Sequence, residues 1–160
     1  MKEIKLSHGK VAIVDDEDFE ELSKYKWRYQ KPSAGGKTGY AWRMTSCRLG
    51  KQRNVRMHRV ILDAPPGAEV DHKDRNGLNN LRENLRLATR SQNNSNWPRN
   101  NKTGFRGVYY SARIRKYRAE IKVNKKFLHL GVFVNSIEAA RAYNEAAIRL
   151  HGDFAVLNNV

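Results

Sequence analysis

Cysteine and long apolar runs are what this sequence most lacks. The chain has 160 residues and one cysteine, Cys47. A single thiol excludes an intramolecular disulfide and a zinc site built on several thiolates, and it suits a reducing intracellular setting. No stretch approaches the roughly 20 consecutive apolar residues of a membrane span, and the first residues contain no apolar run typical of a secretory signal. We therefore expect a cytoplasmic protein that is neither secreted nor embedded in a membrane.

Acidic residues are also scarce. The chain has 16 Asp and Glu against 31 Lys and Arg, which gives a formal net charge of +15 at pH 7. A charge this far from zero indicates a polyanionic partner, most simply a nucleic acid. A soluble basic protein without such a partner stays open, because net charge alone does not exclude it. Only 39% of the residues are hydrophobic, which is enough for one or two small cores.

A polar, turn-rich segment around residues 95–104 divides the chain. It predicts one domain over 1–98, a linker over 99–103 and a second domain over 104–160. Apolar runs in the first domain are short. They predict strands at 11–14, 27–29 and 40–44, and a short helix at 55–62 that the following prolines end.

Residues 69–94 carry the candidate chemistry. Their pattern predicts a strand ending at Asp71 and His72, a turn at 74–77, a returning strand at 85–87 and a helix starting near Arg90. This order brings Asp71 and His72 close to a helix side chain such as Asn93. Carboxylate and amide oxygens are hard ligands suited to Mg²⁺ or Mn²⁺. A neutral imidazole beside them can accept a proton from water.

Several fixed spacings lie within residues 58–94. They are His58-Arg59, Asp71-His72, Asp74-x-Asn76-Gly77, Leu78-Asn79-Asn80, Glu83-Asn84-Leu85-Arg86 and Thr89-x-x-x-Asn93-Asn94. This pattern resembles the His-Asn-His (HNH) endonucleases with the ββα-metal fold, in the phage and intron homing branch. The third position of the motif is asparagine here, a change that is common in that branch.

The resemblance implies a role for each matching residue. His72 is expected to be the general base that activates the attacking water, and Asp71 and Asn93 are expected to hold one divalent metal, Mg²⁺ or Mn²⁺. Asn84 is expected to orient the His72 ring through a hydrogen bond, with Asn80 as a lesser candidate for a similar role. His58 is interpreted as a packing or capping residue.

Residues 104–160 predict a three-stranded antiparallel sheet followed by one helix. The strands are expected at 104–110, 116–123 and 127–133, with a hairpin turn at 124–126. In the middle strand Ala119 and Ile121 alternate with basic residues such as Lys122, so one face is apolar and the other mostly basic. Asn135 and Gly152 suit the start and the end of the helix.

Further motifs lie in this second half. They are Phe105-Arg106-Gly107-Val108, Tyr117-x-Ala119-Glu120-Ile121, Leu130-Gly131-x-Phe133 and Glu138-Ala139-Ala140-x-Ala142-Tyr143-Asn144. They resemble the AP2/ERF DNA-binding domain, which implies a sheet docked in the DNA major groove. The expected DNA-binding residues are Arg106, Tyr109, Arg113, Arg115, Lys116, Arg118 and Lys122. Phe127 and His129 stand where that family commonly has an arginine and a tryptophan, so its base preference is not transferred.

We therefore predict an α+β protein with an N-terminal HNH nuclease domain and a C-terminal AP2-like sheet and helix. The predicted function is a homing-type endonuclease acting on double-stranded DNA in a bacterial or phage-infected cell. A monomer with one site is expected to nick one strand, and a dimer stays open. The alternative is a non-catalytic DNA-binding or regulatory protein. RNA binding is disfavoured, because the major groove of duplex RNA is too narrow for a sheet.

Overall fold

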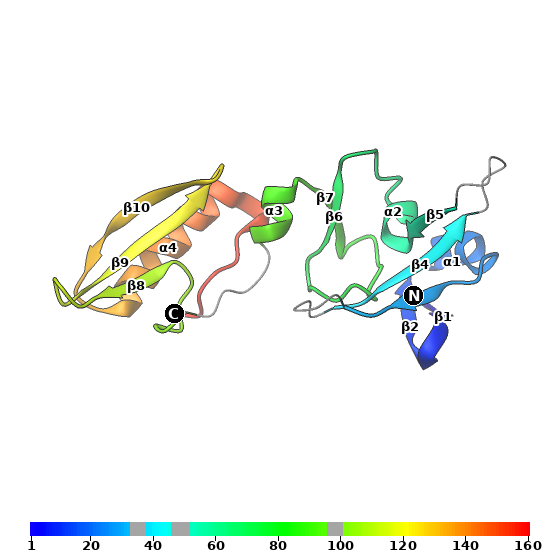
Figure 1. Ribbon diagram of the computed structural model, residues 1–160, viewed down its shortest axis with the longest axis horizontal. Coiled ribbons are helices and arrows are strands. Elements are labelled where there is room, and N and C mark those ends of the chain that lie inside the picture. Colours follow the sequence, from blue (N-terminus) through cyan, green and yellow to red (C-terminus); the bar gives the residue numbers. More distant parts are fainter. Residues whose placement is uncertain (33–37, 46–51, 96–100) are drawn as a thin grey trace. The chain divides into compact units, whose positions relative to one another are not determined.

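The computed structural model describes residues 1–32, 38–45, 52–95 and 101–160 (Figure 1). Cys47 and part of the predicted linker lie outside these residues. Contacts divide the chain into two units, Met1–Arg90 and Ser91–Val160. The domain limits at 98 and 104 stay a prediction. Both units combine helices with antiparallel strands, which confirms the α+β class. Within the described residues no helix is long and apolar enough to cross a membrane.

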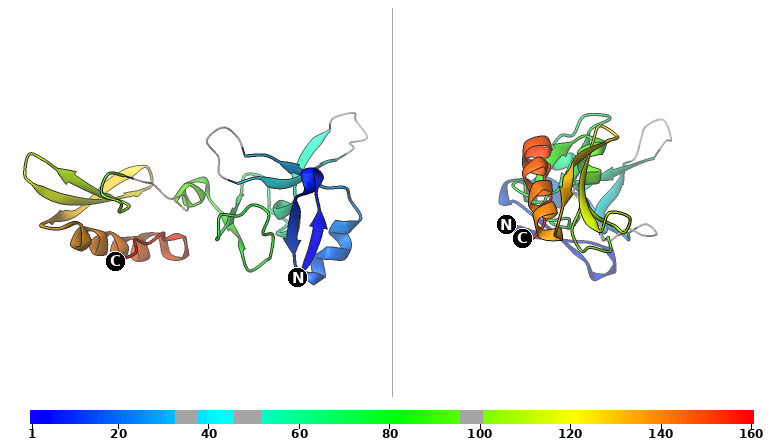
Figure 2. Two further views of the ribbon diagram at one scale, coloured as in Figure 1. Left: turned by 90° about the horizontal axis from the view of Figure 1, so that it is seen from below. Right: turned by 90° about the vertical axis from the view of Figure 1, so that its left-hand side faces the viewer.

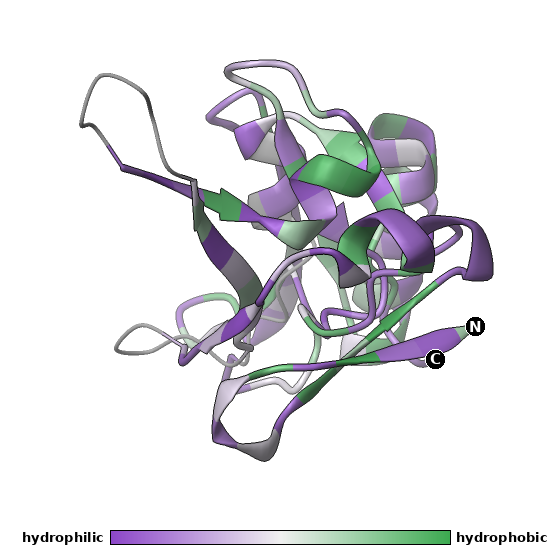
Figure 3. Ribbon diagram, turned by 90° about the vertical axis from the view of Figure 1, so that its right-hand side faces the viewer, coloured by the Kyte–Doolittle hydropathy of each residue, from purple (hydrophilic) through white to green (hydrophobic). Residues whose placement is uncertain are grey.

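The first unit is built from short strands and two short helices. Its elements are β1 (Lys2–Lys5), β2 (Val11–Val14), α1 (Asp16–Ser23), β3 (Arg28–Gln30), β4 (Tyr40–Thr45), β5 (Arg53–Arg56), α2 (Met57–Ile61), β6 (Glu69–His72) and β7 (Leu85–Ala88). They form antiparallel sheets of order β1–β2, β3–β4–β5 and β6–β7. The ribbon coloured by hydropathy shows how short its hydrophobic stretches are, each interrupted by hydrophilic residues (Figure 3).

The helix predicted at 55–62 is shorter than expected. Val55 and Arg56 belong to β5, where they pair with Arg43 and Trp42 of β4. The helix α2 therefore begins at Met57, which is completely buried. The sequence here fits both the alternation of a strand and the spacing of a helix. Pairing with β4 decides that residues 55 and 56 belong to the strand. The strand β1, which the sequence patterns did not predict, pairs along its whole length with β2.

One hydrophobic core joins the sheets of the first unit. It takes residues from β1, β2, β4, α1, α2, β6 and β7, and its members include Ile4, Val14, Leu22, Trp27, Ala41, Met57, Ile61, Val70 and Leu85. The indole of Trp27 also donates a hydrogen bond of 2.8 Å to the carbonyl of Leu22, at the end of α1. Because β6 and β7 each contribute to this core, the strands that carry the candidate site are fixed by apolar burial.

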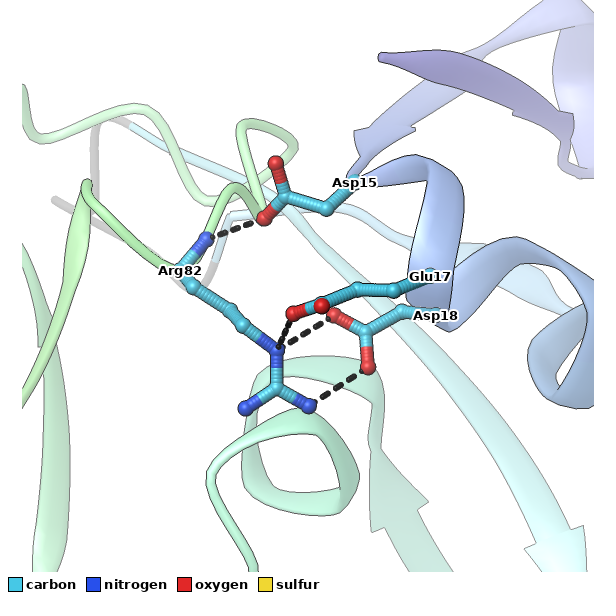
Figure 4. A network of polar contacts seen from close by, with 4 residues as sticks. All are labelled: Asp15, Glu17, Asp18 and Arg82. Atoms are coloured by element: carbon cyan, nitrogen blue, oxygen red, sulfur yellow. Dashed lines mark hydrogen bonds and ion pairs between the residues drawn. The ribbon is translucent and has the colours of Figure 1, made fainter.

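The loop between β6 and β7 is tied to the N-terminal hairpin. The backbone of Ile13 in β2 accepts from Asn80 N at 2.8 Å and donates to Leu78 O at 2.9 Å. Arg82 then contacts α1 and its N-terminus: its backbone N–H donates to Asp15, and its guanidinium contacts Glu17 and both carboxylate oxygens of Asp18, all at 2.7–2.8 Å (Figure 4).

This Arg82 network mainly fixes the position of the loop and adds little to the free energy of unfolding. The guanidinium is partly exposed, and ion pairs in water contribute little each. Its bidentate geometry with Asp18 nevertheless specifies one orientation. These carboxylates also raise the pKa of Arg82, which stays charged throughout.

The second unit has the arrangement that its sequence predicts. It contains α3 (Arg90–Ser95, shared with the first unit), β8 (Val108–Ser111), β9 (Lys116–Val123), β10 (Lys126–Phe133) and α4 (Ser136–His151), followed by a 3₁₀ turn at Gly152–Phe154. The sheet has the order β10–β9–β8, and α4 covers one of its faces (Figure 2). β8 begins at residue 108 instead of 104, because Gly104 and Gly107 have positive φ angles and form turns.

Small residues let α4 lie close to the sheet. Ala139, Ala140, Ala146 and Ala147 are buried on the helix, facing Val108, Ala119 and Ile121 of the sheet. The predicted cap is confirmed, since Asn135 Oδ1 accepts a 2.8 Å hydrogen bond from Glu138 N. The helix ends at Gly152, whose φ is +52°.

Gly77 gives a test of how tightly the β6–β7 loop is packed. A Cβ at this position would lie 2.4 Å from Gly39 O and 2.6 Å from the Tyr40 ring. Gly77→Ala should therefore lower the free energy of unfolding by about 1–3 kcal/mol, the usual cost of overpacking. Urea unfolding followed by fluorescence of Trp27 and Trp42, in a Trp97→Phe background, measures it.

The matched control is Arg75→Ala, at an exposed position of the same loop. It should change the free energy of unfolding by less than about 0.5 kcal/mol. Equal losses in the two variants would show that the loop yields freely around Gly77.

Candidate active site

Antiparallel pairing of β6 with β7 buries two of the predicted site residues. Asp71 pairs with Arg86, and His72 pairs with Leu85. Asp71 is 3% exposed and His72 is 5% exposed, although both side chains are polar. Buried polar groups need partners or must be neutral. The environment of each side chain therefore determines what chemistry it can perform.

Asp71 meets this requirement through Arg86. Its Oδ2 accepts from Arg86 Nε at 2.8 Å and lies 2.7 Å from Arg86 Nη2. Both partners are largely buried, so this is a desolvated ion pair whose loss would leave a buried charge. The role of Arg86 was missed by sequence reasoning, although the predicted return strand at 85–87 already placed it opposite the end of β6.

His72 belongs to a cluster of three rings. His58 packs edge-on against it with ring centroids 5.0 Å apart, and the Tyr40 ring lies 5.8 Å from His72 and 5.5 Å from His58. The three residues come from β4, α2 and β6, which are far apart in the chain. His58 is buried, as a packing residue should be, and its packing partner is the predicted general base itself.

Burial in this cluster keeps both imidazoles neutral. Desolvation, and after it the neighbouring His72, Arg56 and Arg59, lower the pKa of His58 to about 3. Desolvation also lowers the pKa of His72, an effect that Asn80, Asp74 and Asp71 oppose. A neutral His72 at pH 7 has a nitrogen lone pair available to accept a proton.

The hydrogen bonds of Asn84 lie within the β6–β7 loop, and its expected role in orienting the His72 ring stays a prediction. Its Oδ1 accepts from Asp74 N at 3.0 Å, and its Nδ2 donates to Asp74 Oδ1 at 3.0 Å and to Asn79 O at 2.8 Å. All of these bonds close the β6–β7 loop, because Asn84 stands directly before β7. Asn80 is completely buried, its Nδ2 donates to Leu78 O at 3.1 Å, and its side chain raises the pKa of His72 against the effect of burial.

Asn93, the second predicted metal ligand, lies on α3 within the residues that group with the second unit. Its joint use with Asp71 for one cation stays a prediction. Among the described residues no group of three or more His, Cys, Asp or Glu could hold a metal ion. The expected pair has one carboxylate and one amide, which are hard oxygen donors, so its chemistry fits Mg²⁺ or Mn²⁺.

A cationic surface adjoins the ring cluster. Arg28, Trp42 and Arg56 lie side by side across β3, β4 and β5, and cross-strand partners share one face of a sheet. The guanidinium of Arg56 lies 5.0 Å from the Tyr40 ring. Positive charge therefore reaches the ring that contacts His72. Sequence reasoning missed this surface, because it depends on the register of three strands.

The predicted DNA-binding residues lie in three parts of the second unit. Arg106 precedes β8, and its Nε donates a 2.7 Å hydrogen bond to the Tyr143 hydroxyl of α4. Arg113 and Arg115 are exposed in the turn between β8 and β9. The remaining residues lie on the sheet face that α4 leaves uncovered; they are Tyr109, Lys116, Arg118 and Lys122.

Comparison with known proteins agrees with this geometry. The family described as HNH endonuclease matches residues 55–95, from β5 to the end of α3. A protein of Acanthamoeba polyphaga mimivirus named uncharacterized HNH endonuclease L560 is 34% identical over 156 residues, covering 95% of this chain and 76% of its own length. The chain belongs to the HNH endonuclease family. Membership implies a hydrolase of phosphodiester bonds.

Two plant proteins are similar over a shorter stretch. The ethylene-responsive transcription factor-like protein At4g13040 of Arabidopsis thaliana is 55% identical over 42 residues, and APETALA2-like protein 2 of Oryza sativa subsp. indica is 53% identical over 36 residues. These matches cover 26% and 22% of this HNH protein but only 18% and 8% of the plant proteins. They confirm a partial similarity to AP2/ERF DNA-binding domains.

The low pKa of His58 makes stability depend on pH. The unfolded chain, with a histidine pKa of about 6.5, binds a proton before the folded chain does, so acid favours unfolding. The free energy of unfolding should fall from about pH 6.5 downward, by up to about 1.4 kcal/mol per pH unit, until about pH 3. His58→Gln should reduce this slope in urea unfolding at pH 7.5, 6 and 5.

His8→Asn is the control, since His8 is exposed in the same unit. Its slope should match that of the wild type. The explanation is wrong if His58→Gln and His8→Asn lose stability equally with acid.

The Asp71–Arg86 pair predicts strong coupling. Arg86→Gln leaves the Asp71 carboxylate buried without its guanidinium and should cost about 3–5 kcal/mol. Asp71→Asn in the same chain should recover part of this loss, because the uncompensated charge is then absent. A double-mutant cycle from urea unfolding measures the coupling, and additive losses would show that the pair does not act as a unit.

Proposed function

We propose that this protein is a metal-dependent DNA endonuclease in which His72 is the general base. The observation that supports this most directly is the burial of His72 at the end of β6, beside Asp71 and within the segment that matches the HNH family; this burial lowers the pKa of the imidazole. A base must be unprotonated near neutral pH to accept a proton from water. The ring cluster gives His72 that state and one orientation.

Each neighbouring side chain has a task in this proposal. His72 accepts the proton of the attacking water. The rings of His58 and Tyr40 pack against the His72 ring and hold it in place. Arg86 fixes the Asp71 carboxylate, and Asn80 supports the His72 ring. When bound by Asp71 and Asn93, Mg²⁺ or Mn²⁺ supplies electrostatic stabilisation to the phosphate and to the leaving oxygen. Family chemistry implies 3′-hydroxyl and 5′-phosphate products.

The second unit docks the enzyme on its target in this proposal. Its uncovered sheet face carries Arg118 and Lys122, and the adjoining turn carries Arg113 and Arg115. Antiparallel strands with such a face fit the major groove of DNA. Docking by one unit and cutting by the other describes a homing-type, site-directed endonuclease. One site in a monomer cuts one strand, so a nick is the expected product.

A non-catalytic DNA-binding protein is the second candidate. The similarity to plant proteins named as transcription factors favours it. It gives no reason, however, for burying Asp71 and His72 together at the end of β6, next to a loop that Arg82 ties down. A decayed site is free to lose such costly buried polar groups. Cleavage distinguishes the two candidates.

The test uses supercoiled plasmid carrying a library of target sequences, with Mg²⁺, Mn²⁺ or EDTA. The wild type should convert it first to open circles in the presence of either metal. His72→Ala should slow this conversion by about 100- to 10,000-fold, the usual contribution of a general base. Affinity for the same DNA in EDTA should stay within about twofold.

His8→Asn, at an exposed position outside the site, should cleave at the wild-type rate. If the wild type and His72→Ala bind DNA equally and neither cleaves any target with either metal, the non-catalytic candidate is correct. Tighter binding to duplex RNA than to duplex DNA at one salt concentration would contradict both candidates.

A further inference from the structure

The uncovered face of the β8–β10 sheet is not simply basic. Register places Tyr109, Arg118 and Val132 in one row across the three strands, and Lys122 beside Phe127 in another. Phe127 is 62% exposed, Val132 is 44% exposed and Tyr109 is 39% exposed. α4 packs on the opposite face, against Ala119 and Ile121. Three apolar side chains therefore lie on the face that is proposed to meet DNA.

Two cations on this face, Arg118 and Lys122, contact neighbouring side chains of the sheet. Arg118 Nη1 lies 3.9 Å from Glu120 Oε1, and Lys122 Nζ lies 5.2 Å from the centre of the Phe127 ring. Both cationic side chains therefore lie along the surface of the sheet, next to the side chains that they contact. Between these two rows lie Glu120 and His129, so the apolar side chains stand toward the two ends of the face. Phe127 is the most exposed aromatic side chain of the described residues.

An apolar contact in the major groove has one specific partner. Among the four bases of DNA only thymine has a methyl group there, at C5, and apolar side chains such as phenylalanine pack against it. The basic residues around the patch suit the phosphates on either side. They are Arg113 and Arg115 in the β8–β9 turn, Lys125 in the β9–β10 turn and Lys126 at the start of β10. The charge therefore supports DNA as the partner of this face, and the apolar atoms indicate which base pairs the face recognises.

We propose that Phe127 and Val132 are specificity-determining residues that recognise thymine methyl groups, an inference that rests on the proposed DNA docking by this unit. They pair with Lys122 and Arg118, which are four positions apart on β9, because a bulge in β10 takes up the extra residue. Four positions span about 13 Å at about 3.3 Å per residue. A base-pair step rises about 3.4 Å. The two recognised T·A pairs are therefore about four base pairs apart.

The experiment begins with the full chain and a random duplex library in EDTA, so that binding is selected without cleavage. The selected sequences should share two T·A pairs at that spacing. Each of these thymines is then replaced by deoxyuridine, which removes only the methyl group. Fluorescence anisotropy should show about a fourfold loss of affinity at each position, the effect of one buried apolar carbon.

Variants assign each methyl group to a side chain. Phe127→Ala should bind thymine and deoxyuridine equally at one position and keep the discrimination at the other, and Val132→Ala should do the reverse. Ile148→Ala is the matched control, since Ile148 is 57% exposed on α4, away from the sheet face. It should keep both discriminations. Circular dichroism melting of each variant checks that the unit remains folded.

The outcomes separate this inference from the function on which it rests. If the wild type selects no sequence and binds all duplexes weakly, the docking role itself is wrong. If it selects a sequence tightly but binds thymine and deoxyuridine equally at every position, docking stands and methyl recognition is overturned. The same holds if Phe127→Ala and Val132→Ala both keep full discrimination.

Discussion

Burial of a carboxylate and an imidazole at the end of one short strand is the constraint on which the first unit depends. Asp71 and His72 are adjacent in β6, and neither can be taken out of water without compensation. The protein compensates them differently. Asp71 forms an ion pair with Arg86, whereas His72 packs against the rings of His58 and Tyr40 and burial lowers its pKa. One dipeptide thus holds a carboxylate and an imidazole in two different environments.

The rest of the unit can be understood as support for that arrangement. The β6–β7 loop has little apolar content of its own, so it is held by backbone bonds to Ile13 and by the contacts of Arg82 with α1. Asn84 closes the loop from within. Each of these contacts contributes little stability, but each fixes the orientation of the groups that it joins. A catalytic base must be held in one orientation.

The basic residues behind the net charge of +15 lie on two sheet faces with different neighbours. Beside the ring cluster, Arg56 and Arg28 lie on a sheet face next to aromatic rings. On the second unit, cations frame apolar side chains on a sheet face that α4 leaves uncovered. Net charge supplies affinity for any polyanion. Discrimination between sequences requires the groups that lie between the charges, and these differ from one face to the other.

Local patterns were sufficient for much of the molecule. Alternation in β9, the cap at Asn135 and the turn at Gly152 each depend on neighbours in sequence, so the sheet and helix of the second unit were predictable. The spacing of Asp71 and His72 likewise indicated the family. Tertiary contacts decided where β5 ends and α2 begins and that Asn84 closes the β6–β7 loop. They also decided that Arg86 pairs with Asp71 and that His58 and Tyr40 pack around His72. These residues come from strands and a helix distant in the chain, and only the common core that packs them together places them around His72.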